Sequence, residues 1–188
     1  MFSQLNPGEL KRKNSWAPEP AYTSPHSSVV LIGIGNEFRS DDGVGIHLAR
    51  KLKDENIREV AILEHSGEGA SLIGLWERND AVILVDAIFS GSLPGTVTRL
   101  DLLSESLPKE LKPFSTHAFG LREGIALAKN LNRLPARLIM YGIEGKCFSS
   151  GTSLSCDVCE VAEPVTQIIS AELSYLVAEI RTTRNGVA

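Results

Sequence analysis

The sequence predicts an α/β fold, in which a mostly parallel, twisted sheet of about five strands is covered by helices on both faces within a single domain. Short apolar runs rich in β-branched residues, at 29–34 and 81–85, are typical of strands buried on both faces of a parallel sheet. Segments with helical spacing of apolar residues separate these runs. Strands that alternate with helices in this way indicate a parallel sheet between two helical layers.

The expected elements follow one another regularly after residue 28. The first strand, 29–34, is followed by a helix that ends near Lys53, for which Ser40, Asp41 and Asp42 supply cap-type residues. The remaining elements are expected in this order: a strand at 60–64, a helix at 70–78, a strand at 81–85, a short edge strand at 96–101, a helix at 118–130, a strand at 138–143 and a long helix at 161–180.

Residues 1–28 differ from the rest of the chain. They contain four prolines and a basic run at 11–13, and they lack hydrophobic periodicity. We therefore expect a flexible N-terminal leader at 1–28 and a folded domain at 29–188. A short amphipathic segment and a partner-binding arm are the alternative interpretations of residues 1–28.

Composition excludes several functional classes. The net charge of −4 and the isoelectric point near 5.6 argue against a nucleic-acid-binding protein. No apolar run is long enough to cross a bilayer, so no membrane partner is expected. Three cysteines, an odd number, do not suggest a disulfide framework. We expect a cytoplasmic protein that is a monomer.

Three side chains are candidates for a common site, because ligands of such sheets bind beyond the carboxyl ends of the strands. Asp86 ends a buried strand, where a charge is costly unless it is paired or bound to metal; a structural turn cap is the alternative. Asp42 falls in the first turn of a helix, where plain N-capping is the alternative. His117 precedes a helix and fits a surface histidine equally well. Glu64, His65 and Glu144 are expected at the same rim.

Two carboxylates and one imidazole would form an oxygen and nitrogen ligand set. Such a set suits nickel, zinc or manganese with coordination positions left open. A dinucleotide-binding motif is excluded, because its third glycine would fall at Phe38. Cys156 and Cys159 form a C-x-x-C pair near Cys147, which we interpret as ordinary cysteines, with a redox or metal role as the alternative.

The segment GIGNEFRSDDGVG at 33–45 resembles the N-terminal signature of the nickel-iron hydrogenase maturation proteases. The resemblance continues in the expected order and spacing over nearly the whole chain after Val29. The further motifs lie at 86–88, 94–97, 117–121 and 142–144. At 64–69, EHSGEG replaces the D-G-G-T-x-G of many relatives; this loop resembles the branch that serves bidirectional, NAD-linked hydrogenases.

The resemblance implies an endopeptidase that recognises the nickel-loaded precursor of the hydrogenase large subunit and removes its C-terminal extension. It also implies that Asp42, Asp86 and His117 bind the metal, with Asp42 or Asp86 as the catalytic base. The nickel would be carried by the substrate, and other divalent ions would fit the same site. Water is the expected nucleophile, activated by the metal or by a carboxylate.

Two other functions remain open at this point. The first is a non-catalytic nickel-sensing or chaperone module on the same fold, which would bind the precursor without cutting it. The second is a nucleotide-binding α/β enzyme, which the residue at position 38 argues against.

Overall fold

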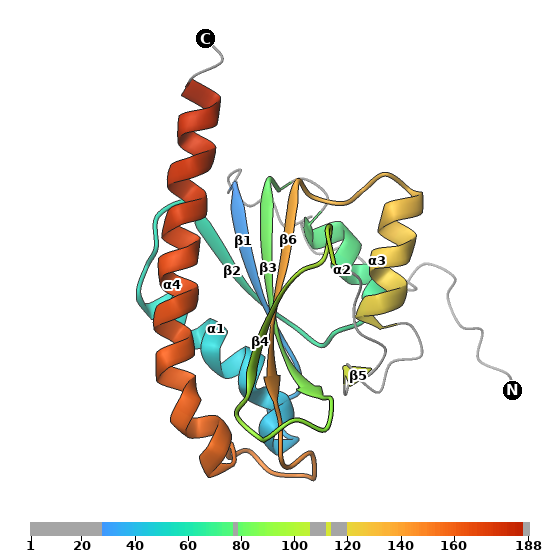
Figure 1. Cartoon of the computed structure of the whole chain (residues 1–188), viewed down its shortest axis with the longest axis vertical. Coiled ribbons are helices and arrows are strands. Elements are labelled where there is room, and N and C mark those ends of the chain that lie inside the picture. Colours follow the sequence, from blue (N-terminus) through green and yellow to red (C-terminus); the bar gives the residue numbers. More distant parts are fainter. Residues whose placement is uncertain (1–27, 77–78, 106–111, 114–119, 186–188) are drawn as a thin grey trace, which may run out of the picture.

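A twisted sheet lies between two helical layers in the computed structural model, which describes residues 28–76, 79–105, 112–113 and 120–185 (Figure 1). Its strand order is β2-β1-β3-β6-β4, and β5 pairs with β3 off this path. The strands are β1 (Val29–Ile34), β2 (Val60–His65), β3 (Ala81–Phe89), β4 (Val97–Asp101), β5 (Lys112–Pro113) and β6 (Arg137–Glu144). β1, β2, β3 and β6 are parallel, whereas β4 is an antiparallel edge strand and β5 pairs antiparallel. The predicted fold class is confirmed.

The helices divide between the two faces of the sheet. On one face, α1 (Val44–Asp54) and α4 (Cys156–Asn185) share a buried cluster with Ile83 and Val85 of β3. On the other face, α2 (Gly69–Trp76) and α3 (Leu121–Asn130) share a second cluster with Leu84 and Ile88. Neighbouring residues of β3 therefore face opposite layers, as the pleat of a strand requires. Asp86 lies two residues from both Leu84 and Ile88, so it is on their side of the strand and faces α2 and α3.

The end of β3 was predicted wrongly. The strand continues through Asp86 to Phe89, four residues beyond the predicted end at Val85. Its ladder with β1 does stop at Val85, but its ladder with β6 continues as far as Ile88. Asp86 therefore lies inside β3 and just past the last pair with β1. It remains at the carboxyl edge of the sheet on that side.

Two glycines allow the chain to return closely over this edge. Gly35 has a φ of +140°, and a Cβ there would lie 1.8 Å from the carbonyl oxygen of Asp42. A Cβ on Gly45 would lie 2.3 Å from the carbonyl oxygens of Ile34 and Val85. The first turn of α1 thus packs backbone to backbone against β1 and β3, which only glycine permits.

The predicted cap of the first helix has a different form. Ser40–Gly43 forms a 3-10 turn, η1, whose residues are buried, and no side chain caps it. α1 then begins at Val44. The side chains of Asp41 and Asp42 are therefore available for other contacts, which define the region of the candidate site.

The predicted leader lies almost wholly outside the described residues. Its last residue, Ser28, is buried, and its carbonyl accepts the backbone N–H groups of Asp80 and Ala81 at 3.0 and 3.1 Å. Within the described ranges, no helix is both long and apolar enough to cross a bilayer.

Candidate active site

Two of the three predicted site residues, Asp42 and Asp86, are brought together and buried. Asp86 is 3% exposed and Asp42 is 5% exposed. Burial and the nearby Asp42 carboxylate raise the pKa of Asp86 to about 8, against a smaller opposing effect of the Ala87 N–H. A carboxyl group with this pKa is mostly protonated at neutral pH.

Asp42 has a milder perturbation of the same kind. Burial raises its pKa above the ordinary aspartate value, while the positive charge of Arg39 and the backbone N–H of Asn36 oppose the shift. Adjacent buried acids with raised pKa values are common at catalytic and metal sites, because their environment disfavours two isolated negative charges.

His117, the third predicted ligand, lies outside the described residues. Within the described part of the chain, no group of three or more His, Cys, Asp or Glu side chains is arranged to hold a metal ion. The described carboxylates therefore supply two donors of the predicted set, and the position of the imidazole stays a prediction.

A cleft of about 360 Å³ opens next to Asp42 at the carboxyl edge of the sheet. Residues from the turn after β1, from η1, from α1 and from the end of β2 line this cleft: Gly35, Asn36, Glu37, Phe38, Arg39, Asp42, Ile46, Glu64, His65 and Ser66. Asp86 is not among them, although it is buried close enough to Asp42 for the two charges to interact. The site thus has one carboxylate residue that lines the cleft and a second one that does not.

Asp41 has a structural role that differs from that of its neighbour. It is fully buried, and its carboxylate accepts the backbone N–H groups of Lys146, Cys147 and Ser155 and the hydroxyl of Ser155, all at 2.7–2.8 Å. Burial alone would raise its pKa, but these hydrogen bonds hold the pKa below its usual value. Asp41 therefore does not act as the expected N-cap; its side chain holds the loop that precedes α4.

The other predicted rim acid, Glu144, is also fully engaged. It is 1% exposed, and its carboxylate accepts the N–H and hydroxyl of Ser90 and the N–H of Gly91 at 2.8–3.0 Å. It therefore fixes the loop after β3. Since its oxygens bind this loop, Glu144 is a supporting residue of the site.

His65 is oriented by two contacts where it lines the cleft. Its Nδ1 accepts the N–H of Gly67 at 2.9 Å, and its Nε2 lies 2.9 Å from the hydroxyl oxygen of Ser71. Because Nδ1 acts as an acceptor, the neutral ring carries its proton on Nε2. The segment at 64–69, singled out by its departure from many relatives, thus contributes its first three residues to the lining of the cleft.

Comparison with known proteins identifies the family. The profile described as HycI, hydrogenase maturation protease, matches residues 44–172, well over half of the chain. The chain belongs to the hydrogenase maturation protease family. The hydrogenase expression/formation protein HupD of Thiocapsa roseopersicina is 28% identical over 153 residues, which cover 79% of this chain and 67% of HupD. HupD of Rhizobium leguminosarum bv. viciae is 30% identical over 135 residues, covering 68% and 64%. The chain thus spans about two thirds of these relatives.

Solved structures of the maturation protease family have the same architecture. The [NiFe] hydrogenase maturation protease HycI of Thermococcus kodakarensis KOD1 superimposes with a TM-score of 0.62 at 27% identity, over 79% of this chain and 93% of that one. The hydrogenase maturating endopeptidase HybD of E. coli gives a TM-score of 0.63 at 24% identity, over 77% and 91%. The likeness to HybD shows the fold alone.

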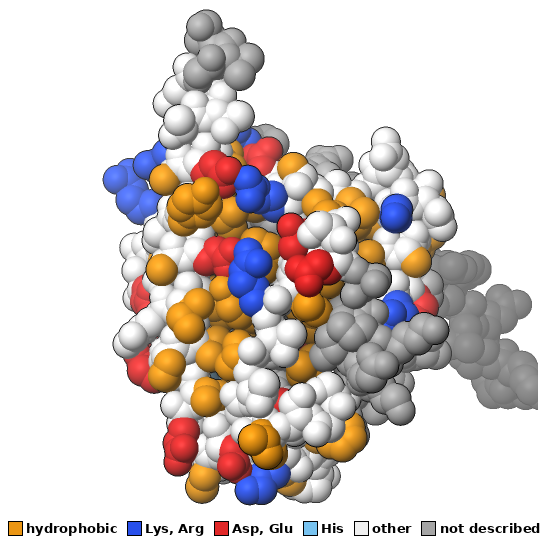
Figure 2. All heavy atoms as spheres, in the orientation of Figure 1, with side chains coloured by type: hydrophobic (Ala, Val, Ile, Leu, Met, Phe, Trp, Pro, Cys, Tyr) orange, Lys and Arg blue, Asp and Glu red, His pale blue; other side chains and the backbone are white. Residues whose placement is uncertain are grey.

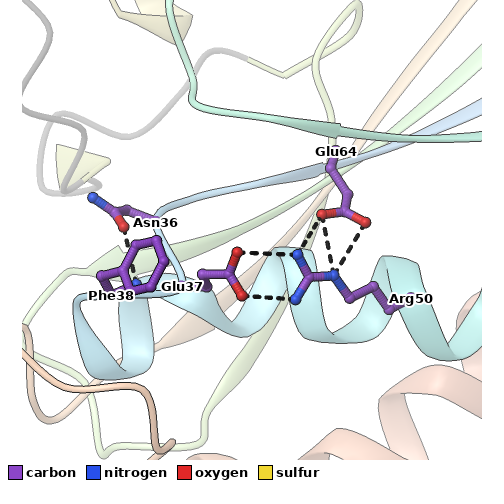
Figure 3. A network of polar contacts seen from close by, with 5 residues as sticks. All are labelled: Asn36, Glu37, Phe38, Arg50 and Glu64. Carbon is purple, nitrogen blue, oxygen red and sulfur yellow. Dashed lines mark hydrogen bonds and ion pairs between the residues drawn. The ribbon is translucent and has the colours of Figure 1, made fainter.

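One polar network of this maturation protease was not predicted from its sequence. Arg50 of α1 forms ion pairs with Glu37, in the turn after β1, and with Glu64 of β2, each at 2.8 Å (Figure 3). Both glutamates line the cleft. The available signal was the helical spacing of Arg50 one turn after Ile46, which places both residues on the same side of α1.

The cysteines are free thiols. Cys156 and Cys159 are exposed in the first turns of α4, and the Sγ of Cys147 lies 3.0 Å from the hydroxyl oxygen of Ser149. The three do not form a metal cluster, because no such group occurs among the described residues. The interpretation as ordinary cysteines stays a prediction.

Proposed function

We propose that this maturation protease is an endopeptidase that recognises the nickel-loaded precursor of a hydrogenase large subunit and removes its C-terminal extension. The observation that carries the proposal is the buried pair Asp42 and Asp86 at an open cleft. Membership of the protease family supports the same reaction. We include in the proposal that the protein acts as a monomer in the cytoplasm.

The chemistry of the carboxylate pair fits a divalent cation. Burial and mutual repulsion disfavour the charged forms of Asp42 and Asp86, and a cation between them would offset both effects. Two carboxylate oxygens, completed by the imidazole of His117, suit nickel as well as zinc or manganese. The nickel arrives in the precursor and is therefore part of the substrate.

The two carboxylates have different tasks in this proposal. Asp42 lines the cleft, so we assign to it the role of the base that accepts a proton from the attacking water. Asp86 does not line the cleft and keeps its proton until a positive charge comes next to it, because its pKa is about 8. A divalent cation held by these carboxylates would polarise a carbonyl group and lower the pKa of a bound water.

This difference accounts for selectivity towards the loaded precursor. Without a neighbouring cation, Asp86 is neutral at pH 7 and the pair is only partly charged. Nickel in the precursor stabilises the ionised pair, so the site gains its working charge state only when the correct substrate is present. Metal binding by carboxylates is coupled to proton release in this way.

A mass measurement tests the proposed function. Purified protein is incubated with nickel-loaded precursor and, separately, with nickel-free precursor. We expect the mass of the C-terminal extension to be lost only from the loaded precursor, and no loss with the D86N variant. Stable binding of the loaded precursor without any cleavage would instead establish the non-catalytic nickel-sensing module.

A further inference from the structure

The lip of the cleft carries an aromatic side chain on a fixed backbone. The N–H of Phe38 donates to the side-chain oxygen of Asn36 at 2.9 Å (Figure 3). The carbonyl of Phe38 accepts the N–H of Gly151 at 3.0 Å. The N–H of Ser40 donates to the carbonyl of Gly151 at 2.8 Å. The turn is thus joined to the loop before α4 on both sides of position 39.

The ring of Phe38 is nevertheless left in water. It belongs to a residue that is 66% exposed and lines the same cleft as Asp42. Single exposed apolar residues are ordinary on protein surfaces. Phe38 differs because its backbone is already ordered, so a ligand that covered the ring would gain apolar burial without paying to order the turn.

Arg50 fixes the same turn from the other side. Its guanidinium donates to both carboxylate oxygens of Glu37 and to those of Glu64 (Figure 3). Glu37 belongs to the turn that carries Phe38, Glu64 lies at the end of β2, and both line the cleft. Arg50 therefore links two segments of the cleft lining and holds the Phe38 turn next to β2. A planar, forked donor can hold two carboxylates in this way, whereas a lysine cannot.

We propose that Phe38 determines specificity by packing against an apolar side chain of the precursor next to the scissile bond, and that Arg50 is a positioning residue that holds the Phe38 turn at the correct distance. The proposal rests on the proposed function and deepens it. The position of Phe38 supports this role, because Phe38 and Asp42 line the same cleft of about 360 Å³. That volume is in the range of small-ligand pockets and suits a short extended segment.

Kinetics with matched variants tests the role of Phe38. F38A should raise KM for the loaded precursor about tenfold and leave kcat within about twofold, since contact with the substrate is lost and the chemistry is not. F38L should restore most of the affinity because it restores an apolar surface. Y175A is the control: Tyr175 is an equally exposed aromatic residue, 62% exposed, on α4 outside the cleft, and its variant should behave as wild type.

Substrate variants then identify the contact. Residues on both sides of the cut are replaced by alanine one at a time and cleaved by wild-type enzyme and by F38A. One replacement of an apolar residue should raise KM for the wild type and have no further effect in F38A, as expected of two side chains that touch. Independent effects at every position would overturn the assignment.

A second pair of variants tests Arg50. R50Q should raise KM about threefold with little change in kcat, in line with the modest energies of exposed ion pairs. R50K should give only partial rescue. R181Q is the control, because Arg181 forms a similar forked pair with Glu59 outside the cleft, and it should cleave as wild type.

The outcomes separate this inference from the proposed function. If wild-type enzyme cleaves the loaded precursor while F38A and R50Q show wild-type KM values, the inference is wrong and the function stands. If the wild-type enzyme binds the precursor but does not cleave it, the proposed function is wrong. Binding that F38A weakens and Y175A does not would then still support the contact.

Discussion

Ser155 bonds twice to the carboxylate of Asp41, through its backbone N–H at 2.7 Å and through its hydroxyl at 2.8 Å. Ser155 immediately precedes α4, and Asp41 lies in the turn beside Asp42. These bonds join the start of the last helix to the edge of the sheet on which the proposed chemistry takes place. The same hydrogen bonds of Asp41 therefore stabilise the fold and fix the turn that carries Asp42.

D41N should destabilise the protein by about 1–3 kcal/mol, because charge-assisted bonds to a buried carboxylate are replaced by weaker ones and one acceptor becomes a donor. Urea unfolding at pH 7 measures the change. D157N is the matched control: Asp157 forms an exposed ion pair with Lys146, so this substitution should destabilise the protein much less than D41N does. Equal losses of unfolding free energy in D41N and D157N would show that Asp41 does not hold the loop before α4 in the way assigned to it.

D86N should leave the fold intact and abolish processing. An amide is neutral and similar in size to the protonated carboxyl group that burial favours, so the apparent stability at pH 7 should equal or exceed that of the wild type. Thermal unfolding and the cleavage assay are measured on the same preparation. Retained cleavage of loaded precursor would exclude Asp86 from the site.

H117A should also abolish processing if the imidazole completes the ligand set. The variant is compared with the wild type for nickel retention by the enzyme–precursor complex and for loss of the extension. Unchanged cleavage in H117A would leave the two carboxylates without their predicted nitrogen donor.

A chain that begins at Ser28 should cleave the precursor nearly as well as the full-length protein. The cut is placed before Ser28 because its carbonyl bonds to the N–H groups of Asp80 and Ala81, and removing it would expose the start of β3. The kcat/KM values of both chains are compared. A large loss in the shorter chain would mean that residues 1–27 contact the substrate.

Glu172 of α4 should make stability depend on pH in the acid range. Burial would raise its pKa, but hydrogen bonds from Arg99 and Tyr141 lower the pKa below the ordinary value. A carboxylate with a depressed folded-state pKa stabilises the protein above the unfolded-state value, near 4.5, and this contribution is lost as the pH falls through the folded-state pKa.

E172Q tests this dependence. The difference in stability between wild type and variant should be constant near pH 7 and should shrink below about pH 4.5, as measured by urea unfolding at several pH values. E163Q is the control, since Glu163 lies on the same helix as Glu172 and forms an exposed pair with Lys51 of α1. Acidic and basic side chains lie next to one another on the face over α4 and β4 (Figure 2). Among them Glu172 is partly buried in its pair with Arg99, so comparing E172Q with E163Q separates a partly buried ion pair from an exposed one.

Much of the fold could be predicted because its signals are local. Continuously apolar runs identified β1 and β3, and apolar spacing identified α1 and α4. The end of β3 could not be predicted in this way. Asp86 is polar, and polarity alone suggests that a strand has ended, whereas pairing with β6 extends the strand past it.

The site was predictable only in part, because roles there depend on distant partners. Spacing cannot separate Asp41 from Asp42, since the bonds that distinguish them come from residues 146–155. The ties of Arg50 to Glu37 and Glu64 depend on how α1 lies across two strands. The pairing of Asp42 with Asp86 was expected from the rule that strand ends converge, whereas the place of His117 stays a prediction.

The alternation of β3 side chains between the two faces of the sheet limits how this chain can be altered. Inserting or deleting a single residue between Ala81 and Asp86 would turn the carboxylate to the opposite layer, among the apolar side chains of α1 and α4. An insertion in the exposed loop after Phe89 would leave that orientation unchanged. The length of this strand therefore has to be kept when this protein is redesigned for new substrates.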